Sequence, residues 1–482
     1  MSTPIEVRSL DRLPRDGCLI VPSRLDANQA NALASSLAGR NITWLVEETV
    51  TLTEELQSYL QHSGHRGAAF SKTDESLPDV GRNLGPKIEA NGVLIFVPGV
   101  TNVRPGSSCH IPSGILQALC QLEIPIAPLD VSVPAEMKLE IENSSKFPAA
   151  ILNFSNAIPR GQATIARYRE ALLIASEESF SSRDFLRESL AMAILQGLKK
   201  HSKKNSLYEK ILGAALALSK EIKLATKKKR IGVILPPGRG GTIANIAVLF
   251  ANKIPVNLNF TASHEAIGSA IRQADLDRFI TADPFVRKVA DFPWPPNRDL
   301  LFIERILPRI KKKIVKWVLL GKILPAQIIA KLHGIGKSKG DEEALLLFTS
   351  GSSGEPKGVP LTHRNLLANV CQFGRQLDLP EETKLLGCLP LFHSFGTTAT
   401  LLFPIIEGLD LVTYPSPLET KRLAELISQH QVSLLLTTPT FLRGYMRHVN
   451  PEMLSSLKIV VTGAEKLAVN LANSFEEKFG IL

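Results

Sequence analysis

Short apolar runs alternate along this chain with longer stretches in which apolar residues recur every three or four positions. The short runs are typical of buried strands, and the longer stretches are typical of amphipathic helices. Regular alternation of the two predicts an α/β layer fold. In the first 180 residues, strands are predicted at 17–22, 42–47, 92–98, 124–131 and 151–154, and a helix at 27–37.

The same alternation resumes near residue 206, with a helix at 207–223, a strand at 230–235 and a helix at 242–251. The turn between the last two is rich in glycine, but Ile243 stands where a dinucleotide-binding fingerprint needs a third glycine, so a plain strand-to-helix turn is predicted. Residues 167–197 have a helical pattern, and 199–205 form a polar, basic hinge. We therefore expect domains at 1–180 and 206–482, joined by a helical and basic linker at 181–205.

Composition is ordinary for a soluble globular protein, with 44% hydrophobic and 21% charged residues. No apolar stretch has the length of a transmembrane helix, and the first thirty residues lack the apolar core of a signal peptide. The five cysteines show neither pairing nor metal-ligand spacing, which is typical of reduced thiols, so we expect no metal site in the chain. The expected location is the cytoplasm, with peripheral association at the inner membrane face.

The net charge of +10 is concentrated in basic clusters at 199–204, 227–230 and 311–316. A nucleic-acid partner is disfavoured because aromatic residues are not interleaved with the cations, whereas an anionic membrane surface suits the pattern. The strongest cluster lies in 310–332, where six lysines alternate with aliphatic residues and Trp317, and Pro325 is expected to break the helix. Two interpretations stay open: a segment in a membrane interface, or a packed helix with a solvated lysine face.

The candidate chemistry centres on 345–365, where an apolar run ends in hydroxyls and glycines before a helix predicted to begin near Thr362. Glycines let a backbone close around an anion, N–H groups and hydroxyls donate to phosphate oxygens, and a lysine adds a point charge. Glu355 and Pro356 separate the last glycine of the run from the lysine, so this is not a Walker loop. The loop residues are Thr349, Ser350, Gly351, Ser352, Ser353, Gly354, Lys357 and Gly358.

Two further motifs follow short apolar runs. His393 lies beside Phe392 in 388–396, where a histidine next to aromatic residues is commonly a packed residue. Gly463, Ala464 and Glu465 follow the apolar run 457–461, and such a glycine permits the close approach of a flat base. The apolar segment 434–442 is interpreted as core.

The loop 349–358 closely resembles the signature loop of the adenylate-forming superfamily, which includes acyl-CoA and acyl-carrier-protein synthetases. Segment 256–261 resembles the subgroup fused to phospholipid acyltransferase domains. The resemblance covers 206–482 and implies that ATP and Mg²⁺ are the cofactors. It implies that the loop residues hold the pyrophosphate end of ATP, that Gly463, Ala464 and Glu465 contact adenine, and that His393 and Lys357 act in catalysis, His393 by positioning the acyl carboxylate.

The implied reaction is ATP-dependent activation of a fatty acid to acyl adenylate, followed by transfer to the thiol of acyl-carrier protein or CoA. In the family, a segment carrying the Mg²⁺-binding glutamate, a ribose-binding aspartate and a small domain with a catalytic lysine would follow residue 482. The sequence therefore predicts the incomplete N-terminal α/β subdomains of an adenylate-forming enzyme, inactive or nearly so as written.

Residues 1–180 resemble the glycerophospholipid acyltransferase domain, but with degenerate motifs. Arg24 matches the family histidine, Gln29 matches the aspartate of the dyad, and Asp26 is too close to substitute. The family Pro-Glu-Gly-Thr motif reads Pro-Gly-Val-Thr at 98–101. Because arginine stays protonated, we expect an inactive acyltransferase-like scaffold. Two alternatives remain: a lysophospholipid acyltransferase in which Asp26 or another residue replaces the dyad, and a non-catalytic, membrane-associated acyl-binding protein.

Overall fold

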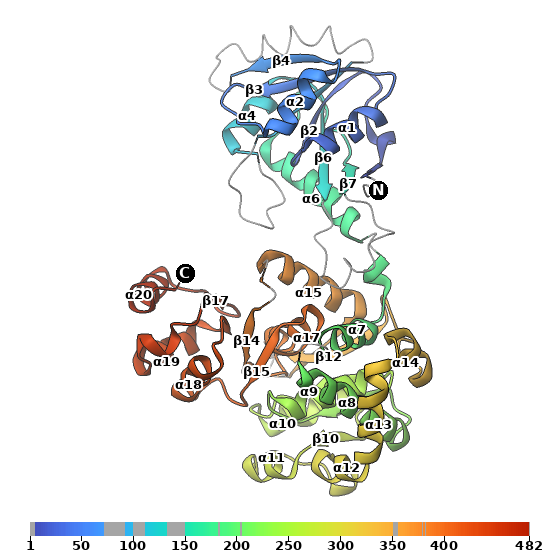
Figure 1. Cartoon of the computed structure of the whole chain (residues 1–482), viewed down its shortest axis with the longest axis vertical. Coiled ribbons are helices and arrows are strands. Elements are labelled where there is room, and N and C mark those ends of the chain that lie inside the picture. Colours follow the sequence, from blue (N-terminus) through green and yellow to red (C-terminus); the bar gives the residue numbers. More distant parts are fainter. Residues whose placement is uncertain are drawn as a thin grey trace. The chain divides into compact units, whose positions relative to one another are not determined.

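The computed structural model describes residues 5–71, 92–99, 111–132, 150–181, 184–202, 205–349, 355–377, 379–380 and 382–481. The chain divides between residues 183 and 184 into two compact units (Figure 1). Among the described residues, no helix combines the length and apolar composition needed to span a bilayer.

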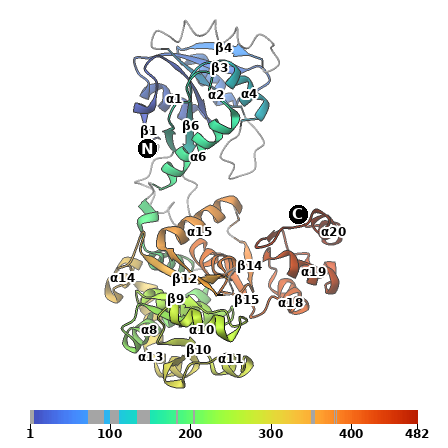
Figure 2. The ribbon, with the colours of Figure 1, turned by 180° about the vertical axis from the view of Figure 1, so that it is seen from behind.

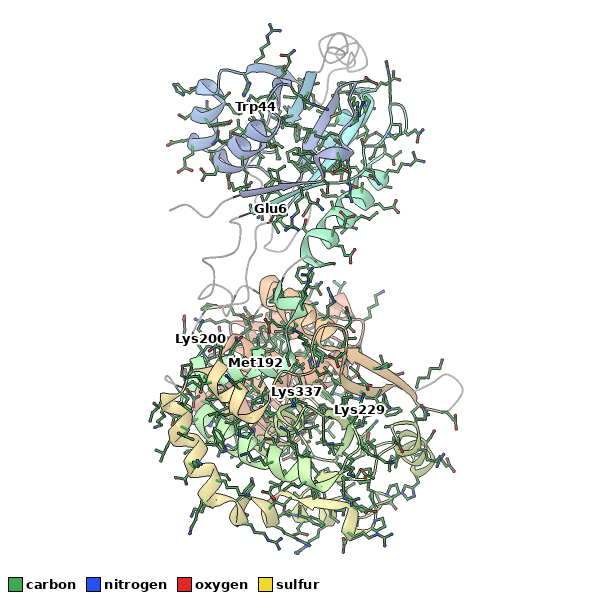
Figure 3. All side chains as sticks on the ribbon, turned by 90° about the vertical axis from the view of Figure 1, so that its right-hand side faces the viewer. Glu6, Trp44, Met192, Lys200, Lys229 and Lys337 are labelled. Carbon is green, nitrogen blue, oxygen red and sulfur yellow. The ribbon has the colours of Figure 1, made fainter. Side chains whose placement is uncertain are left out.

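The first unit is a seven-stranded sheet with helices on both faces. The strand order is β1-β7-β6-β2-β5-β3-β4, and all neighbours are parallel except β6 and β7. The strands are β1 (Ile5–Arg8), β2 (Cys18–Pro22), β3 (Asn41–Glu47), β4 (Arg66–Phe70), β5 (Gly92–Phe96), β6 (Ile126–Ser132) and β7 (Ala150–Phe154). Helices α1 (Ala27–Ser36) and α2 (Glu54–His62) share a core with one face, and α4 (Ser113–Gln121) and α6 (Ile165–Ser181) with the other. Trp44 of β3 is buried in the first of these cores (Figure 3).

Burial explains which strands the sequence predicts. Every residue of β2, β5, β6 and β7 is buried, so these strands are mainly apolar in sequence, and all of them are predicted. The hydrophobic pattern does not indicate β1 and β4, which lie at the two edges of the sheet and are largely exposed or half-buried. Edge strands lack the continuous apolar signal because one side faces water.

The segment joining the two units contains more helix than the sequence predicts. The helical pattern at 167–197 is divided between α6 and α7 (Leu190–Ser202), with a 3₁₀ turn at Asp184–Arg187. The prediction of a basic hinge at 199–205 is wrong for its first four residues, because Lys199–Ser202 form the last turn of α7. The Lys199 ammonium donates to the carbonyl of Gly321, so this lysine serves packing within the second unit.

The second unit contains two sheets. The larger has the order β11-β10-β8-β9-β12-β13 and the smaller β15-β14-β16-β17, and only the β12–β13 pair is antiparallel. The strands are β8 (Arg230–Val233), β9 (Ile254–Asn257), β10 (Phe279–Thr281), β11 (Leu300–Phe302), β12 (Glu343–Thr349), β13 (Lys357–Thr362), β14 (Lys384–Gly387), β15 (Asp410–Thr413), β16 (Leu434–Thr437) and β17 (Ile459–Thr462).

Helices cover both sheets of this unit (Figures 1 and 2). They are α8 (Ser206–Ala225), α9 (Arg239–Phe250), α10 (His264–Gln273), α11 (Asp283–Lys288), α12 (Ile303–Arg309), α13 (Lys311–Ile323), α14 (Ala326–His333), α15 (His363–Leu377), α16 (Ser394–Gly396), α17 (Phe403–Glu407), α18 (Thr420–His430), α19 (Pro439–His448) and α20 (Val469–Phe479). The strand predicted at 230–235 and the helices predicted at 207–223 and 242–251 correspond to β8, α8 and α9.

The lysine-rich segment 310–332 forms two helices. As Pro325 predicts, α13 ends at Ile323 and α14 begins at Ala326. Trp317 is buried, and its ring centroid lies 4.3 Å from that of His333 on α14. The inner side of α13 therefore packs as an ordinary helix.

His333 makes the stability of this packing depend on pH. Burial, reinforced by Lys220 and Lys223, lowers the pKa of His333 from 6.5 to about 4. The buried neutral imidazole therefore stabilises the fold fully above pH 6.5, and this contribution is lost as the pH falls toward 4. At pH 5 the loss is about 2 kcal/mol. The free energy of unfolding should therefore fall less between pH 7 and pH 5 in His333→Leu than in the wild type, by about 2 kcal/mol. Urea denaturation at both pH values measures this difference. An equal fall in the variant and the wild type would contradict the lowered pKa of His333.

Candidate active site

Three of the predicted motifs follow the carboxyl ends of strands in the second unit. The loop motif follows β12, the His393 motif follows β14, and residues 463–465 follow β17. In parallel sheets the carboxyl ends meet at one edge, where ligands commonly bind. The fold thus places each motif where an α/β protein builds its site.

The loop motif closes a β-hairpin. Thr349 at the end of β12 pairs with Lys357, and Phe348 pairs with Gly358. The predicted residues Ser350, Gly351, Ser352, Ser353 and Gly354 lie outside the described residues. Thr349, Lys357 and Gly358 are exposed, so their polar groups face solvent at the mouth of the hairpin.

The sequence predicts a loop that leads directly into a helix, and this prediction is wrong between Lys357 and Thr362, which form the strand β13. Lys357–Thr362 instead pairs along β12 as an edge strand, a position that tolerates Pro360. The helix start itself is confirmed: the Thr362 hydroxyl accepts the N–H of Asn365 at 3.1 Å, and the side-chain amide oxygen of Asn365 accepts the N–H of Thr362 at 3.0 Å. This reciprocal cap starts α15 at His363.

The turn after β14 is tightly constrained. The Thr397 hydroxyl donates to the carbonyl of Leu391 at 2.6 Å, and the Thr397 N–H donates to the carbonyl of His393 at 2.8 Å. His393 is exposed over more than a third of its surface, and its ring lies 4.8 Å from that of Phe392. Partial desolvation lowers the pKa of His393 below 6.5, so its imidazole is neutral at pH 7.

The fold brings the motifs after β14 and β17 together. A Cβ on Gly463 would lie 3.1 Å from the ring of Phe395, so glycine allows this approach. Ala464 has a φ of 65°, a left-handed conformation uncommon for alanine. The Glu465 carboxylate accepts a hydrogen bond from the Thr440 hydroxyl at 2.7 Å. These contacts fix the backbone of 463–465 beside the His393 turn.

A pocket of about 480 Å³ lies between these elements and the β12–β13 hairpin. It is lined by Leu345, Leu347, Leu361, Asn365, Leu366, Asn369, Phe373, Ser394, Phe395, Thr397, Thr398, Ala399 and Ala464. The lining is mainly apolar, with Ser394 and Phe395 following His393 directly. Sequence reasoning misses the wall supplied by α15, although Asn365, Leu366, Asn369 and Phe373 recur at helical spacing on one face.

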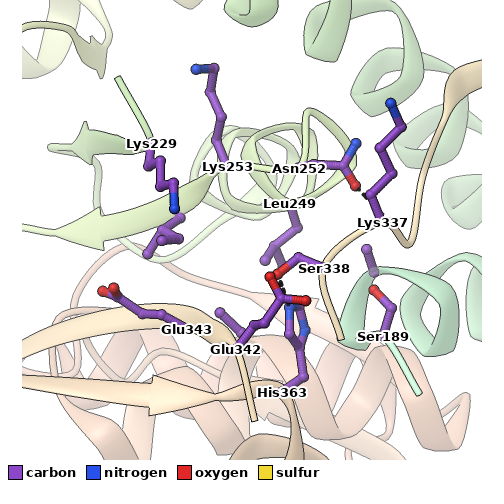
Figure 4. A pocket seen from close by; sticks show the side chains of 13 residues that line it. Ser189, Lys229, Leu249, Asn252, Lys253, Lys337, Ser338, Glu342, Glu343 and His363 are labelled. Atoms are coloured by element: carbon purple, nitrogen blue, oxygen red, sulfur yellow. Dashed lines mark hydrogen bonds between the residues drawn. The ribbon is translucent and has the colours of Figure 1, made fainter. Parts of the chain in front are cut away.

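A second pocket, of about 360 Å³, lies at the opposite, amino-terminal edge of the larger sheet, where β9 and β12 begin (Figure 4). Lys229, Lys253 and Lys337 line it together with Glu342 and Glu343. His363 is buried at its base, where Nδ1 accepts the N–H of Leu190 at 3.0 Å and Nε2 lies 3.2 Å from the Ser338 hydroxyl. Burial lowers the pKa of His363 to about 4, so this histidine is a neutral structural residue.

In the first unit, the motif residues Arg24, Asp26 and Gln29 make hydrogen bonds that hold the local fold. The Arg24 guanidinium donates from Nε to the carbonyl of Val131 at 3.1 Å. The Asp26 carboxylate accepts the N–H of Gln29 at 2.8 Å, and the Gln29 side chain accepts the N–H of Asp26, which forms a capping box at the start of α1. Asp26 is thus engaged in a helix cap. Residues 100–106, including Thr101 and Arg104, lie outside the described residues.

Comparisons with known proteins bear on the second unit. The sequence model of the family described as "AMP-binding enzyme" matches residues 205–482. The chain is 29% identical over 281 residues to a long-chain-fatty-acid–CoA ligase of Bacillus subtilis, covering 53% of this chain and 49% of that protein. It is 32% identical over 145 residues to 4-coumarate–CoA ligase 3 of Arabidopsis thaliana, covering 29% and 26%.

One similar solved structure is a fatty acyl-adenylate ligase from L. pneumophila in complex with acyl adenylate and pyrophosphate. It aligns with a TM-score of 0.49 and 18% identity, and the alignment covers 60% of this chain and 52% of that chain. The chain spans about half the length, or less, of the curated relatives that it matches.

Proposed function

This chain belongs to the AMP-binding enzyme family, and from that membership we propose that its second unit takes part in activating a fatty acid with ATP. The product would be an acyl adenylate, whose acyl group passes to the thiol of CoA or of an acyl-carrier protein. The observation that carries the proposal is the apolar pocket of about 480 Å³ between β12, β13, α15 and the two motifs after β14 and β17. Its volume is within the range of small-molecule sites.

The pocket suits a fatty acid because its lining is apolar in one part and polar in another. Leu345, Leu347 and Phe373 give it an apolar lining, which favours burial of methylene groups. Ser394 and Ala464 line the part nearest the two strand-end motifs, where hydroxyl and backbone groups would meet the polar head of the substrate. A fatty acid would therefore enter with its chain between β12 and α15 and its carboxylate toward the His393 turn.

The proposed chemistry is in-line attack of the carboxylate on the α-phosphorus of ATP, with pyrophosphate as the leaving group. Lys357 and the Thr349 hydroxyl would neutralise and orient the pyrophosphate end, with the loop 350–354 between them, and Gly463, Ala464 and Glu465 would contact the adenine. Neutral His393 would donate a hydrogen bond that orients the carboxylate. Within the described residues, no group of three or more His, Cys, Asp and Glu side chains is placed to hold a metal ion.

For the first unit we propose a degenerate acyltransferase-like domain, residues 1–180; the segment 181–205, predicted as a linker, holds α7, which packs within the second unit. In the proposed alignment Arg24 takes the position of the family's base, and a guanidinium that is already protonated cannot take up a proton. The helix cap made by Asp26 argues against its recruitment as a replacement. The first unit would then act as a scaffold, and lysophospholipid acyl transfer is the less supported alternative.

Fatty-acid-dependent exchange of labelled pyrophosphate into ATP tests the proposed function, using this chain alone and then with any separately encoded partner that supplies the remaining segments of the family. Filling the pocket with Asn369→Trp is expected to lower kcat/KM about ten-fold more for long-chain than for short-chain fatty acids, because the added ring occupies space for terminal methylenes. Gln372→Trp, on the exposed side of α15, is the control and is expected to leave chain-length preference unchanged. The proposal is refuted if no fatty acid supports exchange by the folded chain, either alone or with such a partner.

A further inference from the structure

The outward side of α13 and α14 carries an unusual concentration of exposed aliphatic side chains. We call this set the aliphatic stripe: Val315, Leu319, Ile323, Ile328 and Leu332, which are 51%, 57%, 78%, 45% and 60% exposed. Within the described residues, these are five of the twelve large hydrophobic side chains that are exposed. Their spacing is four residues within each helix, so each set lies along one helix face.

The packing of α13 fixes the direction of this face. Trp317 and Gly321 are buried on the side toward α8, where Gly321 lies near Leu212. A Cβ on Gly213 of α8 would meet Val318 at 2.5 Å, which shows how closely the two helices approach. On α13, Val315, Leu319 and Ile323 project away from this contact, and both views show α13 and α14 at the outer edge of the unit (Figures 1 and 2).

The chain segment that carries the stripe is basic. Residues 305–340 contain ten lysines and arginines and no aspartate or glutamate. Lys312 and Lys316 are exposed on the same side of α13 as Val315 and Leu319, and Lys331 is exposed on α14. The flanking lysines are anchored to α8, since Lys313 pairs with Glu221 at 2.8 Å and Lys322 pairs with Glu209 at 3.2 Å.

We propose that the aliphatic stripe docks this unit on the surface of an anionic phospholipid bilayer. A helix face that mixes branched aliphatic and lysine side chains suits an interface in which apolar groups enter the acyl boundary and ammonium groups meet lipid phosphates. The stripe projects from the outer sides of two helices, and a bilayer, unlike a folded protein, needs no complementary pockets to receive it. The protein would lie on the bilayer, and the proposal is independent of the adenylation reaction.

Sedimentation with vesicles of phosphatidylcholine alone, or with added phosphatidylglycerol, tests this docking surface on the intact chain. The wild-type chain is expected to bind the anionic vesicles, and binding should weaken as salt rises. Lys312→Gln with Lys316→Gln should weaken the partition constant roughly 25-fold at low salt, about five-fold for each lysine. Leu319→Ser with Ile323→Ser should weaken it at least about ten-fold at every salt concentration.

Matched controls use exposed residues elsewhere in the same unit. Leu418→Ser removes an aliphatic side chain that is 75% exposed, and Lys421→Gln removes an exposed lysine on α18; neither should alter vesicle binding. Circular dichroism establishes that each variant is folded. Equal binding by the Leu319/Ile323 variant and the wild type overturns the proposal, as does equal wild-type binding to neutral and anionic vesicles. Failure to bind vesicles combined with stripe-dependent binding to an acidic acyl-carrier protein would also overturn it, because the stripe would then be a protein interface.

Discussion

Gly396→Ala is expected to lower the free energy of unfolding of the second unit by about 3 kcal/mol. A Cβ at this position would lie 2.0 Å from the carbonyl oxygen of Pro390 and 2.7 Å from its carbonyl carbon. Both atoms belong to the backbone, so the clash cannot be relieved by rotating a side chain. Relief requires movement of the whole turn, which the hydrogen bonds from Thr397 to Leu391 and His393 hold in place.

Urea denaturation followed by circular dichroism measures this effect, with Gly240→Ala as the matched control. Gly240 lies in α9, and the nearest atom to its added Cβ would be Ile303 Cδ1 at 3.8 Å. This control should be neutral, or stabilising by up to about 1 kcal/mol, because alanine favours helix. If the Gly396 variant unfolds at the wild-type urea concentration, the close approach to Pro390 is absent and the geometry proposed for His393 loses its support.

The second unit shows what the hydrophobic pattern can and cannot predict. Buried strands such as β8 and β16 have short apolar runs and are recognised as such, because parallel strands are covered on both faces. The edge strand β13 escapes prediction because Gly358 and Pro360 are typical of loops. Its pairing depends on contacts with β12, which local sequence does not encode.

The candidate site was only partly predictable for a similar reason. Lys357, His393 and Gly463 can be recognised from the sequence because each follows a short apolar run that predicts a buried strand. The hydroxyls, glycines and cations after such a run indicate where the strand ends. The meeting of Phe395 with Gly463 is not local, because β16 lies between β14 and β17 in the sheet. The α15 wall of the pocket likewise depends on how that helix packs across β12 and β13.

Asp26 in the first unit illustrates the opposite case. From sequence alone, a carboxylate two residues after Arg24 is a candidate replacement for a lost aspartate. The structure instead gives it the reciprocal hydrogen bonds of a capping box with Gln29. An Asp-x-x-Gln pattern before a helix carries this signal locally, and the helix predicted at 27–37 places Asp26 at its cap.

Lys357→Ala is expected to have the largest effect on the proposed activity. The pairing of Thr349 with Lys357 places this lysine at the base of the loop 350–354, and its exposure leaves the ammonium group available to a polyanion. A charge-assisted contact to phosphate that strengthens as pyrophosphate leaves would be lost. Fatty-acid-dependent pyrophosphate exchange should therefore slow roughly ten-fold to a hundred-fold.

The comparison that isolates this contact uses the same exchange assay on the wild type and three variants. Lys357→Arg keeps the charge but not the compact ammonium geometry, and it should retain more activity than Lys357→Ala. Lys421→Ala removes an exposed lysine on α18 and should exchange at the wild-type rate, which controls for a general effect of net charge. Because Lys357 lies on an exposed edge strand, its removal should leave the urea midpoint unchanged. A wild-type exchange rate for Lys357→Ala would exclude this lysine from the nucleotide site and move the pyrophosphate end of ATP away from the β12–β13 hairpin.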